Sequence, residues 1–267
     1  MAAFLVAAAL AAATPAAAPA ATAAVAPDDD PAIFVVHDAD TTVYLFGTFH
    51  ALDGKSDWFN DQVKDAFERS DELVLETLVP EHPSAASFVA PPQQLRTSAV
   101  TPSASFLAST RLAIKAGRSQ GMQVGNGADM VLRRVAESEG KPVEGLETME
   151  SQIAMFAKLP AGPPVPQTAK PVPPMNGLSQ SMAEMQAAWK RGDQRLFVRI
   201  LGQLERGSPD TYRMMFTERN ARWADWIRAR MQTPGTVFVA VGAGHLAGKD
   251  SVLVRLAELG LPSARVN

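Results

Sequence analysis

The alternation of apolar and polar positions divides this chain into short strands and amphipathic helices. Apolar, β-branched or aromatic runs, typical of buried strands, occur at residues 33–36, 42–46, 71–76, 141–147, 236–242 and 264–266. Helical spacing of apolar positions predicts helices over about 57–69, 106–117, 129–139 and 249–259. Residues from about 178 to 231 are helical in pattern, and breaks at 192–193 and 207–209 divide them into about three helices.

The order of these elements predicts an α/β fold. The first two strands flank a turn-rich linker at 37–40, which predicts a hairpin. The helix at 57–69 then joins the second strand to the third, and units of this kind are parallel and right-handed. After the N-terminal segment about 240 residues remain, enough for one domain with a substantial core. We therefore expect a single α/β domain over residues 31–267, with a central mainly parallel or mixed sheet flanked by helices.

Three segments interrupt this pattern. Residues 80–105 are rich in Pro, Ser and Ala and are expected to form a loop, and residues 160–176 contain seven prolines and cannot form a regular element. Residues 1–26 form an Ala- and Pro-rich leader that resembles a signal peptide, although no Lys or Arg precedes its apolar stretch. The signal peptide predicts a periplasmic or secreted protein with no membrane span after cleavage. A disordered low-complexity tail is the alternative.

A strand followed by Gly-x-x-His occurs once near each end of the chain, at Gly47 to His50 and at Gly242 to His245. Glycine gives access to backbone angles closed to other residues, so each histidine is expected just past the carboxyl end of a strand. Ligands bind at this edge of open α/β sheets. A lone histidine after a strand is more often structural, but packing gives no reason for the repeat. The paired motifs therefore predict two halves of one site at the sheet edge.

Two carboxylates end predicted strands in the same way. Glu76 closes the run at 71–76, and Glu147 closes the run at 141–147, which we interpret as another buried strand. Acidic groups at the end of a buried strand are costly unless they are paired or bind a cation. Glu147 has an alternative role as a helix cap or surface acid, because a helical pattern begins at Thr148. With no thiolate available, two histidines and two glutamates suit zinc, manganese or cobalt.

Other polar positions are open to two interpretations. Arg219 and Asn220 either reach the site or lie on the solvent face of their helix. Asp129 follows a glycine-rich turn and is expected to cap the helix that begins there. His37 and His82 stand in loop contexts and are expected at the surface.

Composition excludes several kinds of protein. The formal net charge is −3 and no dense Lys/Arg patch is present, which argues against binding to nucleic acid. The chain has no cysteine, so disulfides, thiol catalysis and cysteine-based zinc sites are excluded. The arginines between 213 and 230 are interleaved with acids and tryptophans, as in an amphipathic helix.

The motifs together resemble the TraB/GumN family, which is related to the TIKI metalloproteases and more distantly to erythromycin-esterase-like and ChaN-like proteins. The resemblance covers about residues 31–267 and implies a single α/β domain. Its most specific parts are residues 45–50, 73–76, 140–148 with Gln152, 219–223 and 238–246. The chain departs from the family pattern at 80–105 and 160–176, where proline-rich sequence replaces helix. This departure leaves substrate recognition open.

The resemblance also implies roles for individual residues. The TIKI branch is described as divalent-metal-dependent proteases, and the family's motif histidines and glutamate match His50, His245 and Glu76. These three are therefore expected as metal ligands. Glu147 matches the acid of the second strand motif, and Arg219 and Asn220 match a polar pair on a helix.

Three functional hypotheses follow. In the first, an exported peptidase-like hydrolase holds manganese, cobalt or zinc with two histidines and a glutamate, a second glutamate acts as general base, and Arg219 faces the developing oxyanion. In the second, no metal takes part, and His50 acts as base or nucleophile with help from Glu76. In the third, a non-catalytic accessory protein uses the same cleft to hold a peptide, glycan fragment or metal.

Overall fold

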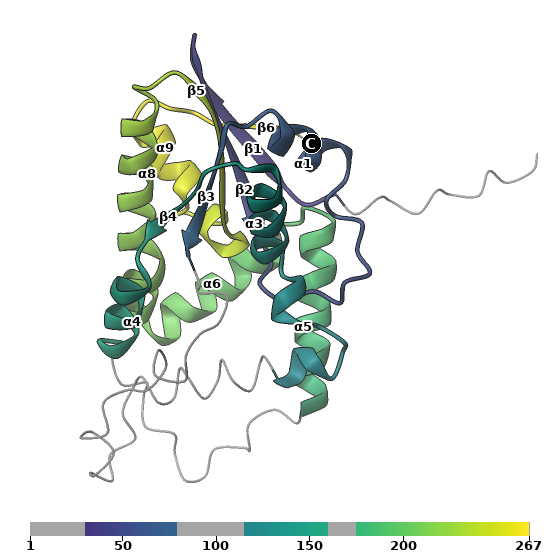
Figure 1. Cartoon of the computed structure of the whole chain (residues 1–267). Helices are drawn as coiled ribbons and strands as arrows, with labels where there is room; N and C mark the ends of the chain where they lie inside the picture. Colours follow the sequence, from purple (N-terminus) through teal and green to yellow (C-terminus); the bar gives the residue numbers. More distant parts are fainter. Residues whose placement is uncertain (1–29, 79–114, 160–174, 267) are drawn as a thin grey trace, which may run out of the picture.

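The computed structural model describes residues 30–78, 115–159 and 175–266, with side chains of 175–180 excepted. Within these residues a sheet of six strands has the order β4-β3-β5-β2-β1-β6. The strands are β1 (Ile33–His37), β2 (Thr41–Thr48), β3 (Glu72–Thr77), β4 (Val143–Glu147), β5 (Gly235–Gly242) and β6 (Ala264–Arg265). Figure 1 shows the sheet between two groups of helices. The predicted single α/β domain with a flanked sheet is confirmed.

The sheet is parallel at its centre and antiparallel at one side. β5 lies between β2 and β3 and pairs parallel with both, and β4 pairs parallel with β3. β1 forms the predicted hairpin with β2, and β6 pairs antiparallel with β1. The predicted strand–helix–strand unit is therefore parallel, but the strand from the C-terminal repeat fills the position between its two strands.

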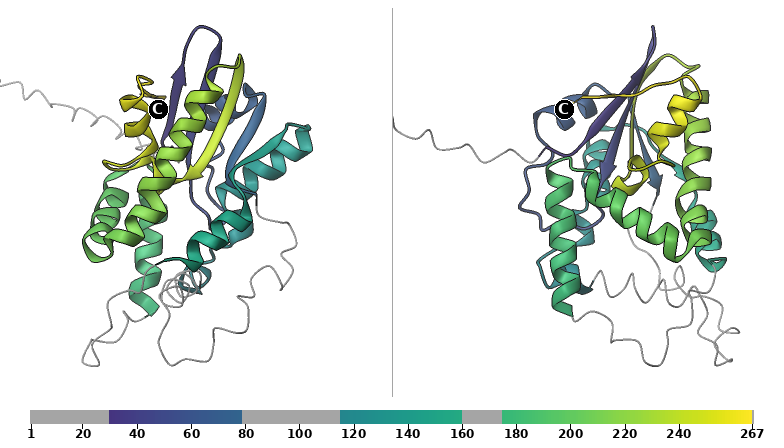
Figure 2. Two further views of the ribbon diagram at one scale, coloured as in Figure 1. Left: turned by 90° about the vertical axis from the view of Figure 1, so that its left-hand side faces the viewer. Right: turned by 180° about the vertical axis from the view of Figure 1, so that it is seen from behind.

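Each face of the sheet is covered by its own helices (Figures 1 and 2). On one face lie α8 (Glu218–Arg230) and α9 (Val252–Glu258), whose buried residues include Trp223 and Leu256. On the other face lie α1 (Asp61–Glu68), α3 (Ala128–Glu139) and the end of α5 (Met175–Lys190), packed around Phe46 and Trp189. Apolar side chains alternate along the strands between these two cores, as expected for a sheet buried on both faces.

The remaining elements lie around the carboxyl ends of the parallel strands. They are the single-turn helix η3 (Val124–Asn126), α4 (Met149–Ala157), α6 (Arg195–Gly207), α7 (Pro209–Tyr212), the π-helical turn η4 (Arg213–Thr217) and the 3₁₀ turn η5 (Ala243–Leu246). Figure 2 shows α6 running across this end of the molecule. None of the described helices has the length and apolar character needed to cross a bilayer.

Several predicted boundaries differ from the structure. The first helix begins at Asp61 instead of residue 57, because Trp58 packs on Phe46 with ring centroids 5.6 Å apart and holds the preceding segment outside the helix. β4 is an edge strand that is partly exposed, whereas a buried strand was predicted. His37 is exposed as predicted but ends β1 instead of lying in a loop.

The long helical region is divided where predicted. α5 ends at Lys190, α6 ends at Gly207, and α7, η4 and α8 continue without a break in place of one regular third helix. α5 already begins at Met175, two residues inside the expected proline-rich loop. The leader at 1–26, the loop at 80–105, His82 and nearly all of the helix at 106–117 lie outside the described residues.

Candidate functional site

The two Gly-x-x-His motifs meet at the carboxyl end of the parallel strands, as their positions predict. β2 and β5 are neighbours, and Thr48 pairs with Gly242 at the end of both strands. A Cβ placed on Gly242 would lie 3.1 Å from His50 Nε2, 3.5 Å from Glu76 Oε2 and 3.6 Å from His245 Cδ2. Three of the predicted site residues therefore surround the glycine of the second motif.

The glycines of the motifs have a different role from the predicted one. Neither Gly47 nor Gly242 has a positive φ, so the turns do not need angles closed to other residues. Each glycine instead makes space for the opposite motif. A Cβ on Gly47 would lie 3.1 Å from Ala243 Cα, and a Cβ on Gly242 would press on the ring of His50. The glycines allow the two motif turns to approach each other.

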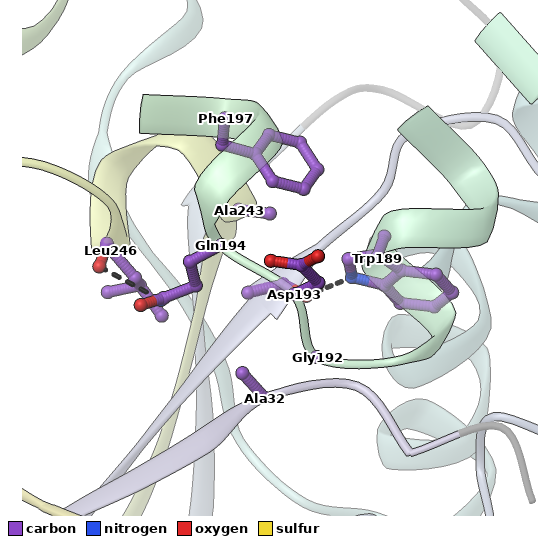
Figure 3. A pocket seen from close by; sticks show the side chains of 9 residues that line it. Ala32, Trp189, Gly192, Asp193, Gln194, Phe197, Ala243 and Leu246 are labelled. Carbon is purple, nitrogen blue, oxygen red and sulfur yellow. Dashed lines mark hydrogen bonds between the residues drawn. The ribbon is translucent and has the colours of Figure 1, made fainter. Parts of the chain in front are cut away.

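A small hollow lies behind these turns (Figure 3). It has a volume of about 20 Å³, and Gly47, Ala243 and Trp189 are among its lining residues. Trp189 Nε1 donates a 2.6 Å hydrogen bond to Gly47 O and so fixes the first turn from this side. Because the hollow has room for about one water molecule, it is a packing gap and not a substrate pocket.

His50 is oriented by a residue that was predicted to have another role. Its Nδ1 lies 3.2 Å from Asp129 Oδ1, in the first turn of α3. The N-cap of α3 is Gly127, so the prediction that Asp129 caps this helix is wrong. Gly127 is required there because a Cβ would lie 2.4 Å from His50 O. The glycine-rich turn thus brings the start of α3 against the first motif and aims Asp129 at His50.

The pKa of His50 is raised to about 9. Desolvation lowers this pKa, but the hydrogen bond and charge of Asp129 and the charge of Glu76 outweigh it. Because 59% of the His50 side chain is open to solvent, the partnership with Asp129 governs the shift. His50 is therefore the exposed member of the site, and its Nε2 stands in a negative local field that favours a cation.

His245 is held in one tautomer by two successive hydrogen bonds. Asn220 Nδ2 donates to Asp250 O at 2.7 Å, so Asn220 Oδ1 faces His245 Nδ1 at 2.6 Å and accepts a hydrogen bond from it. The proton therefore resides on Nδ1, and Nε2 presents its lone pair toward the site. The rings of Phe216 and Trp223 enclose the imidazole, with centroids 4.8 and 4.5 Å away. Burial lowers the pKa of His245 to about 3, so this histidine is neutral at physiological pH.

Arg219 lies between the two predicted glutamates and is 2% exposed. Its Nη2 is 2.5 Å from Glu76 Oε1 and 2.9 Å from Glu147 Oε2, and its Nε donates to Glu147 Oε1 at 2.9 Å. Its Nη1 lies 3.4 Å from both Met215 O and His245 Nε2. Every nitrogen of the guanidinium therefore has a protein partner. Arg219 binds both carboxylates at once.

The two glutamates differ in whether one of their oxygens faces the centre of the site. Glu147 is bound by Arg219 and, at 3.4 Å, by the exposed Arg222, and it begins no helix because Thr148 is the N-cap of α4. Glu76 Oε1 accepts from Arg219 and from Gln152 Nε2 at 3.2 Å, while Oε2 turns toward the histidines and accepts from Gly242 N at 3.3 Å. Glu76 is therefore the carboxylate that presents an oxygen to the centre of the site.

Glu76 stays ionised in this environment. Burial alone would raise its pKa, but electrostatic interactions with His245, Arg219 and His50 and the hydrogen bond from Arg219 lower it to about 2. Since His245 is neutral at physiological pH, Arg219 is the permanent charge that stabilises the Glu76 carboxylate. Glu76 Oε2 and His245 Nε2 are 3.9 Å apart.

The donor set suits a divalent metal, but the side chains do not form a closed cage. Two imidazole nitrogens and a carboxylate oxygen are common ligands of zinc and manganese, and metal-bound histidines usually have the other ring nitrogen held by an oxygen acceptor. Both His50 and His245 meet this condition. Within the described residues, however, no three His, Asp or Glu side chains are arranged to hold an ion as they stand. Arg219 Nη1 also occupies the side of His245 Nε2.

Sequence reasoning identified six of the residues that meet here and missed others. His50, Glu76, Glu147, Arg219, Asn220 and His245 all belong to this cluster. Asp129, Asp250 and Met215 were missed, and only Asp129 left a signal, as an acid beside a glycine-rich turn. Asp250 and Met215 contribute backbone carbonyl groups, which no residue type can reveal.

The fold and the site define an α/β protein with two strand-end histidines and two arginine-bound glutamates at one edge of its sheet. The chain belongs to the TraB/PrgY/gumN family, whose pattern it matches over residues 32–97 and 93–263. No curated protein and no solved structure matches the chain significantly.

Proposed function

We propose that this protein is a hydrolase, acting on peptide bonds at the sheet-edge site of His50, Glu76 and His245 and using a divalent cation held by these three side chains. One observation carries the proposal. Both histidines have Nδ1 bound to a side-chain oxygen, and both face the Gly242 position beside Glu76 Oε2. The resemblance to the TIKI metalloproteases supports it. An ion bound there would polarise the scissile carbonyl and make water a stronger nucleophile.

The chain's own residues orient the three side chains of this site. Asp129 and Asn220 orient the two imidazoles, and Arg219 with Gln152 fixes Glu76 so that Oε2 remains available. His50 is the residue nearest to solvent and is expected on the substrate side. Glu147 acts through Arg219, because both of its oxygens are engaged. We retain export of the protein as part of the proposal, based on the signal-like residues 1–26.

A metal-free variant of this function is the second candidate. It is favoured by the contact between Arg219 Nη1 and His245 Nε2, which occupies a nitrogen that a metal would need. His50 would then be the base, with Asp129 orienting it. Its pKa of about 9 limits this role at neutral pH, because His50 would be mostly protonated.

The test is metal binding measured beside peptide hydrolysis. Wild type should bind one manganese, cobalt or zinc ion in calorimetry, and His50→Ala/His245→Ala should lose it. His37→Ala is the matched control, since His37 is an exposed histidine outside the site. Chelation should abolish hydrolysis of a peptide library. Activity that survives chelation would favour the metal-free variant, and saturable peptide binding without any turnover would replace both with an accessory binding role.

A further inference from the structure

A groove open to solvent lies between the end of α5 and the start of α6. Its volume is about 460 Å³, within the range of small-ligand sites, whereas the hollow behind the motif turns has a volume of about 20 Å³. Three of its eight lining residues are arginines, Arg191, Arg195 and Arg199, and all three are exposed. None of the six residues of the sheet-edge site lines this groove. It is therefore a separate place on the molecule with room for a ligand.

The groove has a fixed shape. Ala187 and Ala188 line it on the α5 side, and their small side chains leave room next to α6. Ala188 is 3% exposed and so belongs to the packed interior. The turn between the helices is held on both sides, because Asp193 N donates to Ala188 O at 2.9 Å and Arg265 Nη1 donates to Gly192 O at 3.2 Å. The space is thus present before a ligand binds.

The positive charge of the groove is only partly matched by the protein. Arg195 is paired with Asp193, to which it donates from Nε at 2.9 Å and from Nη2 at 3.0 Å. Within the part of the chain that the structure describes, the guanidinium groups of Arg191 and Arg199 have no hydrogen-bond or ion-pair partner. Glu184 is the other acid of the lining, so the groove carries three positive and two negative charges in a chain whose formal net charge is −3.

The spacing of the arginines favours an anion between them. Arg195 and Arg199 are four residues apart on α6 and share one face of the helix, and Arg191 precedes them in the turn. Like charges at this spacing repel each other, and an anion between them would replace repulsion with attraction. Each guanidinium also presents N–H donors in a planar fork, which matches two oxygens of a carboxylate or a phosphate.

We propose that the groove between α5 and α6 binds a small organic anion, whose carboxylate or phosphate group is held by Arg191 and Arg199. Ala187 and Leu196 provide apolar surface for the carbon atoms of the ligand. Arg195 contributes less than the other two arginines, because Asp193 already accepts two of its hydrogen bonds. The site is independent of the proposed hydrolysis, which uses other residues.

The test is calorimetric titration of the full chain at constant ionic strength with three probes. Glutarate carries carboxylates, glycerol 3-phosphate carries a phosphate, and glutaramide is the neutral counterpart of glutarate. Arg191→Gln and Arg199→Gln should each weaken binding of the preferred anion about ten-fold, the effect of losing a charged hydrogen-bond donor. Arg228→Gln is the matched control, because it removes the same charge from an exposed arginine on α8, outside the groove, and should bind as wild type does.

Asp193→Asn should change the affinity in the opposite direction. It removes the carboxylate charge beside Arg195 but keeps an oxygen for Arg195 N, which donates to Asp193 Oδ1 at 3.0 Å. Anion binding should become about three-fold tighter, as expected when an exposed ion pair no longer competes. Thermal unfolding should show that this variant and the glutamine variants remain folded. Weaker binding to folded Asp193→Asn would contradict the proposal.

The choice between the two anion classes follows from the probes. Saturable binding of glutarate alone would identify a carboxylate site, and binding of glycerol 3-phosphate alone would identify a phosphate site. The proposal would be overturned if neither anion binds, if glutaramide binds as well as glutarate, or if Arg228→Gln weakens binding as much as the groove variants do. A protein that binds the anion but cleaves no peptide would retain this site and reject the hydrolase.

Discussion

Gly47 and Ala243 are in contact across the two motif turns, and a Cβ on Gly47 would lie only 3.1 Å from Ala243 Cα and 3.3 Å from Ala243 Cβ. Both distances are to atoms of a buried turn that has little room to move. Gly47→Ala should therefore push the second motif away from the first and destabilise the fold by about 1–3 kcal/mol, as overpacking does. Urea denaturation would measure this loss. An unchanged unfolding midpoint would show that the turns separate freely.

Gly242→Ala should reduce ligand binding strongly and stability only slightly. The new methyl group would meet His50 Nε2, which is the end of a largely exposed side chain that can rotate away. The cost in folding free energy should be smaller than that of Gly47→Ala, while metal and peptide binding at the site should fall at least ten-fold. Calorimetry beside urea denaturation gives both quantities. A variant that keeps full binding would place the reactive groups away from Gly242.

Asp129→Asn should lower the pKa of His50 from about 9 toward its ordinary value, because the hydrogen bond and charge of Asp129 raise it. NMR titration of the His50 ring in metal-free protein measures this. The raised pKa means that folded protein binds the His50 proton more tightly than unfolded protein. This stabilisation is complete below about pH 6.5 and is lost as pH rises through about 9. Asp129→Asn should reduce this loss of folding stability at high pH. A His50 titration unchanged from wild type would contradict the pairing of His50 with Asp129.

Removing the Arg219 guanidinium should destabilise the protein severely. Arg219→Met removes the buried counter-charge that Glu76 and Glu147 share, and breaking a buried ion pair costs about 3–5 kcal/mol. Arg222→Met is the matched control, because Arg222 contacts the same Glu147 but is 60% exposed and should cost less than about 1 kcal/mol. Chemical denaturation of both variants tests the difference. Equal losses in the free energy of unfolding would show that burial does not make the ion pairs of Arg219 more important for stability than that of Arg222.

Pattern and motif predicted most of the fold because each strand is a short apolar run and each histidine follows one directly. The position of β5 between β2 and β3 could not be predicted, since local pattern does not encode which strands pair. The glycines of the motifs were predicted to provide unusual backbone angles, but they are needed for space. Their requirement for space arises from Ala243 and His50, which lie about 195 residues away along the chain.

In the site, too, local sequence identified the residues but not their contacts with distant parts of the chain. Residue type identified Arg219 as a site residue but could not show its contacts, because its four partner residues come from four separate elements. Asp129 looked like a helix cap because that is what an acid after a glycine-rich turn most often does. The structure instead gives the N-cap position to Gly127 and places Asp129 against His50. Residue types predict which groups take part, and tertiary contacts determine what each one does.

The insertion of β5 between β2 and β3 also sets the order of events during synthesis. Residues 235–242 leave the ribosome more than 150 residues after β3, so until then β2 and β3 each present an open strand edge with no neighbour between them. Closing that gap joins β3 and β4 to the rest of the sheet and brings His245 to His50 in one step. A nascent or truncated chain therefore has neither the finished fold nor the reactive centre, and the protein acquires both together near the end of translation.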